Sequence, residues 1–598
     1  MKKILLSITF ALMGIVSGFA AKAYPGIVTV TQSDGTELNV RIYGDEHFNW
    51  LTTEDGVLLV QEGNNYYIAE TTTSGTLKAT SFIAHNANKR LPAEIKAIKK
   101  QDLSRFRSYA IQKASPAKAM GTGNSGVKYF PHSGSPKALV ILVEFSDTPF
   151  QSGEKAKNVF EHFLKGKAED NLPDGYEAYT GSYKNKYNLR NKGSVSDYFY
   201  DMSKGTYTPQ FDVVGPYKLN HTSLYYGKGD NDNTYALVSD ACKAADKDVD
   251  FSRYDADGDG MVDLVYLIYA GYPASMSGNP NDIWPKSGPG NDSFGTYDGK
   301  KVCRYGVHAE LNFGRELNQK NGFLLSGIGL FCHEFSHTLG LPDLYPTVDA
   351  SKVDNQNPEM WDLMDGGEYT YNGGYCPTPY SPWEMDAMGW ATPIELSDEK
   401  QTVTLKSYGK ERIAYKIKGE NNEYLLLQNI QIGGWWTGVA YVYKTGMLVW
   451  RIDYNNEDVN LFDNPNNTLG KPKVMIVPAD GYVISDYNHG DGKEWTDKQY
   501  KESLQADPFP GTTKRTELLS VKLNNSTLEK PIYNIKEENG VITFDYLDNI
   551  SAIQLPSVDE TNMTTKQIFS LDGRYLGNDA SKLTKGIYII GKKKVVIK

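Results

Sequence analysis

Cysteine and histidine are scarce in this chain, which has only four cysteines and nine histidines in 598 residues. A thiol mechanism would have to use one of these cysteines. We expect Cys332 on the buried side of its own helix, and Cys376 in GGYCPTP lacks the surroundings of a papain-like nucleophile. The sequence also lacks a G-x-S-x-G nucleophile elbow and a P-loop. These absences argue against cysteine, serine-elbow and P-loop chemistry.

An excess of positive charge is also missing. The 63 Lys and Arg residues face 73 Asp and Glu residues, and the formal net charge is −10. A nucleic-acid partner is therefore not expected, because phosphate binding requires a basic surface. The four cysteines, Cys242, Cys303, Cys332 and Cys376, all fall in one stretch of the chain. In an oxidising compartment they could form two disulfides, with three possible connectivities.

Long apolar runs are absent beyond the N-terminus, so we expect no transmembrane segment. The chain opens with MKKILLSITFALMGIVSGFAAKAYP, a short basic start followed by an apolar run that ends in small residues. Ala21-Lys22-Ala23 is a candidate A-x-A cleavage site, and the pattern is typical of a secretory signal peptide over residues 1–23. We therefore expect a secreted protein, extracellular or on the cell surface of a Gram-negative bacterium.

Changes in composition predict a multidomain α+β protein. Alternating apolar and polar residues after residue 24 predict a small β-rich pro-domain, and a Lys-, Pro- and Gly-containing stretch resembles a linker. The apolar run KALVILVEFSD predicts a buried strand in the next domain, and short alternating segments later in the chain fit a β-sandwich. The predicted units are the pro-domain with its linker at 24–128, a catalytic domain at 129–395, a β-sandwich at 396–550 and a C-terminal β module at 551–598.

The motif CHEFSHTLGLPD, residues 332–343, carries the predicted chemistry. If it lies on a helix, successive residues turn by about 100°, so His333 and His337 share one face. The opposite face is then apolar, with Ile328, Cys332, Phe335 and Leu339. Two imidazoles one helical turn apart can bind the same tetrahedral Zn²⁺, and Glu334 can reach a water at its open position. This arrangement suits metal-activated hydrolysis.

The residues after this helix suggest a third ligand. Gly340 is placed to turn the chain sharply and Pro342 prevents the helix from resuming, so the reversal could bring Asp343 back to the metal. Further on, MWDLMDGGEYTYNGG places a methionine where the longer zincin motifs have a tight turn beneath the metal. Met364 is the better candidate for this turn, and Met360 is the alternative.

These motifs resemble the immune-inhibitor-A-like family of secreted bacterial metallopeptidases. The resemblance rests on HEFSHTLGLPDLY, WDLMDGG and YSPWEMDAMGW, is extended by EYLLLQNIQIGGWWTG, GMLVWRIDY, DPFPG and KPIYNIKEENGVITFDY, and covers roughly residues 130 to 548. It implies a metzincin-like zincin fold with a Met-turn. It also implies zinc on His333 and His337, with Glu334 as general base. The third zinc ligand stays open between Asp343, which the spacing favours, and Glu384 in SPWEMD. The sequence departs from the family at two positions, Gln428 and Arg451.

A second metal site is predicted in DADGDGMVD, residues 255 to 263. Asp255, Asp257, Asp259 and Asp263 alternate around a turn glycine, which suggests a structural Ca²⁺ loop. The twelfth position of an EF-hand would be Tyr266 here rather than glutamate, so helix-loop-helix switching is not implied. The alternative interpretation is an acidic surface turn.

The sequence thus predicts a secreted zinc endopeptidase that hydrolyses extracellular or host proteins and is made as a zymogen. The rival hypothesis is a non-catalytic adhesin that keeps the fold. The pro-segment has no cysteine, so a carboxylate, a backbone carbonyl or simple occlusion would have to block the site, and activation would follow cleavage between about residues 98 and 130. The C-terminal stretch is similar to sorting or surface-attachment modules of Gram-negative secreted proteins, and we expect three short strands there.

Overall fold

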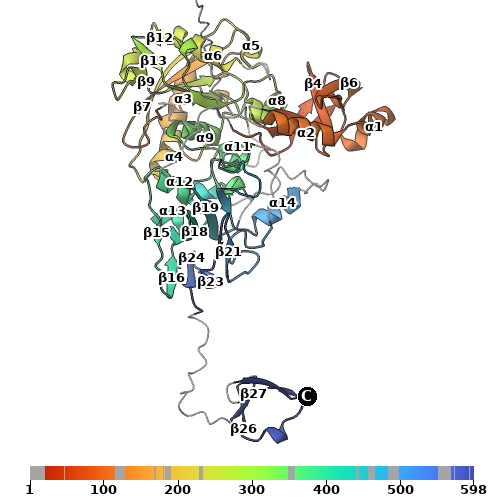
Figure 1. The fold of residues 1–598 in the computed structure, drawn as a ribbon. Coiled ribbons are helices and arrows are strands. Elements are labelled where there is room, and N and C mark those ends of the chain that lie inside the picture. The colour runs from red at the N-terminus through yellow and green to blue at the C-terminus, as the bar shows by residue number, and fades with distance from the viewer. Residues whose placement is uncertain are drawn as a thin grey trace, which may run out of the picture.

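The structure is a computed structural model that combines helices and sheets (Figure 1). Most of the expected signal peptide, residues 1–20, and the linker at 115–127 lie outside the described residues. None of the helices in the described part of the chain is long and apolar enough to cross a membrane. The described residues are 21–45, 48–114, 128–167, 170–179, 181, 190–227, 233–347, 357–439, 444–454, 465–482, 497–549, 567–571, 573–590 and 593–597.

The N-terminal domain is a six-stranded antiparallel sheet whose strands follow one another in sequence order. In β2, buried and more exposed residues alternate, because successive side chains of a strand point to opposite faces. Two helices follow, α1 (Pro92–Ile98) and α2 (Leu103–Ala114). The strands are β1 (Val28–Thr31), β2 (Glu37–Gly44), β3 (Asn49–Thr53), β4 (Leu58–Glu62), β5 (Asn65–Thr71) and β6 (Leu77–Ile83).

The next domain is built on a five-stranded sheet in the order β11-β14-β10-β7-β8. Its strands are β7 (Lys137–Glu144), β8 (Gln210–Lys218), β10 (Val265–Tyr269), β11 (Lys286–Pro289) and β14 (Arg304–Ala309). All are parallel except the edge strand β11. The apolar run at β7 is buried on both faces, which explains its nearly continuous hydrophobicity.

Helices cover both faces of this sheet. The core on one face includes residues of α3 (Ala156–Lys165), α4 (Val195–Met202) and α9 (Ile328–Leu339), and the core on the other face includes α6 (Thr234–Ala245). The helix α9 therefore packs its apolar side against the sheet. The shorter elements of this domain are α5 (Ser223–Gly227), β9 (Met261–Val262), α7 (Ala274–Ser277), β12 (Thr296–Tyr297), β13 (Lys300–Val302), α8 (Arg315–Asn321), α11 (Thr370–Gly374) and α12 (Pro382–Ala387).

After α12 the chain is mainly β-structure. One sheet has the order β15-β17-β18-β19-β20, a second has the order β16-β24-β23, and one hydrophobic core contains residues from both. Gln428 and Arg451 have structural contacts here: Gln428 accepts a hydrogen bond from the Trp450 indole, and Arg451 donates to the Asn524 side chain. The elements are β15 (Ile394–Glu395), β16 (Gln401–Leu405), α13 (Tyr408–Glu411), β17 (Tyr415–Lys418), β18 (Glu423–Ile430), β19 (Gly446–Asp453), β20 (Val474–Ile476), α14 (Asp497–Leu504), β21 (Val521–Lys522), β22 (Thr527–Leu528), β23 (Ile532–Glu538) and β24 (Val541–Tyr546).

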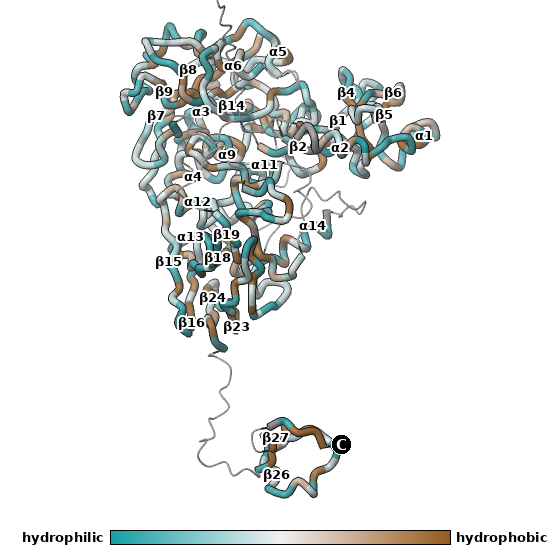
Figure 2. The backbone as a smooth tube through the Cα atoms, viewed as in Figure 1, coloured by the Kyte–Doolittle hydropathy of each residue, from teal (hydrophilic) through white to brown (hydrophobic). Residues whose placement is uncertain are grey.

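The C-terminal module contains four strands rather than the three expected, in the order β26-β25-β27-β28. A turn at Gly573, with φ of 81°, separates β25 (Ile568–Ser570) from β26 (Tyr575–Gly577) and makes the additional strand. β27 (Gly586–Ile590) and β28 (Lys593–Ile597) complete the sheet. The hydrophobic residues of GIYII in β27 stand out in Figure 2.

The cysteines do not form the two disulfides considered from the sequence, because all four are free. Cys242 lies in the core on the α6 face of the sheet, whereas Cys332 and Cys376 belong to the core on the α9 face. Cys376 contacts the Trp435 carbonyl oxygen, and Cys303 contacts the Lys128 carbonyl oxygen. The two disulfides that the sequence left possible are therefore not formed in this structure, although the four cysteines lie in one stretch of the chain.

Candidate metal centre

The helix that carries the motif ends where the sequence indicates. Gly340 has φ of 106°, a left-handed conformation that glycine adopts at low cost, and its N–H donates to the His337 carbonyl oxygen. All twelve residues of α9 are buried, including the face that carries the two histidines. Part of the cover comes from residues 21–24, most of which fall within the signal peptide predicted at 1–23.

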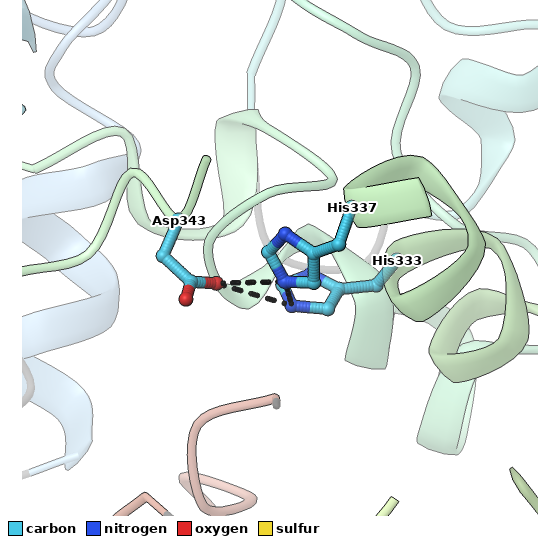
Figure 3. A group of neighbouring side chains, drawn as sticks. All are labelled: His333, His337 and Asp343. Carbon is cyan, nitrogen blue, oxygen red and sulfur yellow. Dashed lines mark hydrogen bonds and ion pairs between the residues drawn. The ribbon is translucent and has the colours of Figure 1, made fainter. Parts of the chain in front are cut away.

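His333, His337 and Asp343 meet at one point (Figure 3). The two Nε2 atoms are 3.2 Å apart, and Asp343 Oδ1 is 3.3 Å from Nε2 of His333 and 3.2 Å from Nε2 of His337. A regular tetrahedron with metal–ligand bonds of about 2.0–2.1 Å has edges of about 3.3–3.4 Å. The triangle of these three atoms therefore has the size of one face of a tetrahedral zinc site.

The outer nitrogens of both rings fix their tautomers. Nδ1 of His333 lies 2.9 Å from the Leu363 carbonyl oxygen, and Nδ1 of His337 lies 2.8 Å from the Leu341 carbonyl oxygen. Since a carbonyl only accepts, each Nδ1 carries the proton and each Nε2 presents a lone pair to the centre. Two lone pairs and a carboxylate oxygen facing one another repel unless a cation lies between them, so the donor set fits a metal ion.

The electrostatics of His333 and Asp343 agree with this interpretation, whereas for His337 burial is outweighed by the Asp343 carboxylate, which raises the pKa of that imidazole. Burial lowers the pKa of His333. Burial alone would raise the pKa of Asp343, but the neighbouring imidazoles of His337 and His333 outweigh it and lower that pKa to about 2. The Asp343 carboxylate is therefore ionised and His333 neutral at ordinary pH, which are the forms that bind zinc.

Glu334 lies beside this triangle and is fully buried. Burial raises the pKa of its carboxyl to about 8. Its Oε1 accepts a hydrogen bond of 2.6 Å from the backbone N–H of Ala21, and the red N-terminal ribbon runs close to the three ligands in Figure 3. A buried carboxyl with a raised pKa is suited to exchanging protons near neutral pH.

Ala21 and Lys22 make several further contacts beside the metal centre. The Trp284 indole donates to the Ala21 carbonyl oxygen at 2.9 Å, and the Tyr369 hydroxyl donates to the Lys22 carbonyl oxygen at 2.6 Å. Ala21 and Lys22 are no more than 1% exposed. Sequence reasoning missed this segment because it ended the leader after Ala23. Gly18 and Ala20 also provide small residues in the spacing of a cleavage site, and that signal points to Ala21 as the first residue.

Glu384, the alternative third ligand, lies elsewhere. Its Oε2 accepts hydrogen bonds from the backbone N–H and the hydroxyl of Ser381, both at 2.8 Å, and thereby caps α12. Asp362 lies beside it and accepts from the N–H of Met364. Met364 is fully buried, next to Leu363, whose carbonyl orients His333. In the described part of the chain, Asp343 is the carboxylate grouped with the two histidines.

The aspartates of the 255–263 loop divide into two groups. Ligand atoms of Asp255, Asp257 and Asp263 lie within 4.8 Å of one another. Asp259 is not part of this group and lies 2.9 Å from Lys128 Nζ, which also contacts Asp257 at 2.7 Å. Burial raises the pKa of Asp263 to about 6. The fourth predicted ligand, Asp259, is thus not brought together with the other three.

Comparison with known proteins points to one family. Residues 128–390 match the family described as immune inhibitor A peptidase M6, catalytic domain. Immune inhibitor A of Bacillus thuringiensis subsp. alesti is 27% identical over 311 residues, which are 44% of this chain and 42% of that protein. The pre-pro-metalloprotease PrtV of Vibrio cholerae is 24% identical over 282 residues, covering 41% of this chain and 29% of that protein.

A putative secreted metallopeptidase of Arthroderma benhamiae is 22% identical over 280 residues, which are 41% of this chain and 39% of that protein. The aligned part thus spans less than half the length of each of these relatives. Two of these relatives are named as metallopeptidases, and the residues that match the peptidase family, 128–390, include the helix with the two histidines. The comparisons therefore support an immune-inhibitor-A-like metallopeptidase domain over residues 128–390 of this chain.

Proposed function

We propose that the chain is a secreted zinc-dependent endopeptidase that hydrolyses extracellular or host proteins and is made as a zymogen. The observation that carries the proposal is the triangle of His333, His337 and Asp343 with the Glu334 carboxyl beside it. The same three residues are the proposed zinc ligands, and Glu334 is the proposed general base. The names of two relatives, a pre-pro-metalloprotease and a putative secreted metallopeptidase, and the peptidase family matched by residues 128–390 support the same reaction class.

Zinc held by these residues would supply a Lewis acid that polarises a peptide carbonyl and lowers the pKa of water. The carbonyls of Leu363 and Leu341 hold the two imidazoles in the tautomer that such a site needs. Glu334 takes the proton from the attacking water and passes it to the leaving amine. Its raised pKa makes both transfers accessible near neutral pH.

Casein or gelatin hydrolysis by the activated protein tests this function. We expect hydrolysis that a zinc chelator abolishes and that a thiol-directed inhibitor leaves unchanged. Zinc stoichiometry measured on the purified protein should be close to one per chain. Hydrolysis that survives complete removal of zinc would contradict the proposal.

The contacts of residues 21–24 support the zymogen proposal. A substrate cannot reach Glu334 while Ala21 donates to its carboxylate and the segment fills the centre. In this proposal the segment blocks the centre by occlusion, which is one of the three possibilities considered from the sequence, and the backbone N–H of Ala21 contacts Glu334. Cleavage after α1, between about residues 98 and 130, would free the N-terminal domain and let the segment leave.

N-terminal sequencing of the latent and active forms secreted by the native host tests the zymogen proposal. We expect the latent form to begin at Ala21, because that start places a new amino group beside Glu334. The active form should begin after residue 98. An active form that still begins at Ala21 would contradict the inhibitory role of this segment.

We also propose a calcium ion in the loop that contains Asp255, Asp257, Asp259 and Asp263, with Asp259 in an outer role. The grouping of three carboxylates and the burial of Asp255 support it, and the contacts of Lys128 and Lys300 with this loop are consistent with its need for positive charge. The proposed role is to stiffen the catalytic domain. For the C-terminal sheet we propose sorting or attachment to the cell surface.

A further inference from the structure

The side chain of Lys22 fills an acidic pocket next to the metal centre. Its Nζ lies 2.6 Å from Asp365 Oδ1 and 3.5 Å from Glu359 Oε2, and all three side chains are no more than 1% exposed. The two acids are held in place from behind: the N–H of Glu359 donates to Asp365 Oδ2, and the Tyr500 hydroxyl donates to Glu359 Oε2. The pocket is thus a buried acidic site that holds an ammonium group.

A third acid lies near this pocket. Glu368 is fully buried, and its Oε2 lies 3.8 Å from Nδ1 of His333. Burial raises the pKa of Glu368 well above the usual range of a carboxyl, so it adds no negative charge to the pocket at neutral pH.

The contact of the segment with Glu334 indicates which residue of a bound substrate Lys22 would correspond to. In the proposed reaction Glu334 delivers a proton to the leaving amine. The nitrogen that lies beside the Glu334 carboxylate is that of Ala21. Ala21 therefore occupies the place of the first residue after the scissile bond, and Lys22 occupies the place of the second.

Neighbouring contacts fix this register for any peptide in the same place. The Trp284 indole and the Tyr369 hydroxyl hold the carbonyl oxygens of the first and second residues. The methyl group of Ala21 packs in an apolar cluster with Leu330 and Met276, which favours a small apolar first residue. Substrate backbones can form the same hydrogen bonds, because these contacts do not involve side chains of residues 21 and 22.

Removal of the segment takes away the ammonium group that lies against Glu359 and Asp365. Buried carboxylates are costly unless a cation or several hydrogen bonds compensate them. We propose that the pocket of Glu359 and Asp365 selects protein substrates with lysine as the second residue after the scissile bond. This inference rests on the proposed peptidase function. It makes the two acids specificity-determining residues that contact substrate.

A series of quenched fluorescent peptides tests the inference on the activated protein. The peptides share one sequence with alanine after the scissile bond and differ only in the next residue, which is lysine, glutamine or glutamate. Mass spectrometry of the products identifies the bond that is cut. We expect kcat/KM to be at least about tenfold higher for lysine than for glutamine, and lowest for glutamate.

Two variants test whether the acidic pocket causes the preference for lysine. Asp365→Asn should lower the ratio of kcat/KM for the lysine peptide to that for the glutamine peptide by at least about fivefold. Asp292→Asn removes the same charge at a residue that is 88% exposed, and should leave this ratio unchanged. If Asp365→Asn does not fold, the peptide series measured on the wild-type protein still tests the inference.

The possible outcomes distinguish failure of the specificity inference from failure of the proposed peptidase function. Equal rates for the lysine, glutamine and glutamate peptides, or a lysine preference at another position, would overturn the specificity inference and leave the peptidase function intact. Failure to cut any peptide or casein in the presence of zinc would overturn the proposed function and the inference with it.

Discussion

Replacing Lys22 by methionine should release the latency of the intact zymogen. Methionine keeps the length and most of the apolar stem of lysine but removes its charge. In the structure this charge lies 2.6 Å from Asp365 and 3.5 Å from Glu359, and the side chains are no more than 1% exposed. Removing one partner of a buried ion pair costs about 3–5 kcal/mol, because the other charge stays buried without compensation.

The free-energy loss expected for Lys22→Met depends on the contacts that remain around Asp365. Asp365 still accepts a hydrogen bond from the N–H of Glu359, so we expect the lower end of that range. A loss of about 3 kcal/mol, at 1.4 kcal/mol per factor of ten, shifts the equilibrium between the occupied and the vacated centre by about 100-fold. The methionine variant should therefore cleave a small peptide about 100 times faster than the intact wild-type zymogen.

The assay is the initial rate of cleavage of a small fluorogenic peptide, with gel electrophoresis to show that the chain remains uncut. Lys22→Arg is the matched control, because it keeps the positive charge and should remain latent. The methionine variant should also melt at a lower temperature than the arginine variant. If Lys22→Met is as latent as the wild type, the contact of Lys22 with the acids does not hold the segment in place.

Four further substitutions test the centre and the loop. Glu334→Gln should retain zinc but lose at least about two orders of magnitude in turnover, and near-normal activity would contradict its role as the base. Asp343→Asn should lower the measured zinc content, whereas Glu384→Gln should leave it near one per chain; the reverse result would exchange the two assignments. Asp257→Ala should lower the melting temperature in calcium but not in a calcium chelator, because a ligand stabilises only the state that binds it. The raised pKa of Asp263 means that, without calcium, stability is lost as the pH rises through about 6. Calcium should offset this loss, so its stabilising effect should be larger at about pH 7.5 than at about pH 5, and a pH-independent effect would argue against this site.

The sequence predicted the parts of the site that depend on local geometry. The spacing of His333 and His337 by one helical turn places both rings on one face of α9, and Gly340 ends that helix where its left-handed conformation is required. The apolar run at β7 likewise predicted a buried strand. Such features follow from helix periodicity and backbone sterics, which a short stretch of sequence contains in full.

Features that depend on distant segments could not be predicted in this way. The choice between Asp343 and Glu384 depends on where a carboxylate lies after the chain has turned, and Glu384 is held by Ser381 at the start of its own helix. The environment of Lys22 is formed by residues more than 300 positions away, at 359 and 365. No local pattern indicates such a contact, because a lysine near a leader is common in any secreted protein.

The position of signal-peptide cleavage decides whether the contacts of Ala21 and Lys22 can both form. Cleavage after Ala23 would remove both the N–H that contacts Glu334 and the ammonium that fills the acidic pocket. Cleavage after Ala20 keeps both, and turns the first nitrogen of the chain into an amino group beside a carboxylate. The burial of Ala21 and Lys22 is difficult to explain if these residues are discarded before the protein folds, since their contacts would then never form. In the proposed zymogen, the three residues that separate the two candidate cleavage sites therefore decide whether the segment that covers Glu334 is retained.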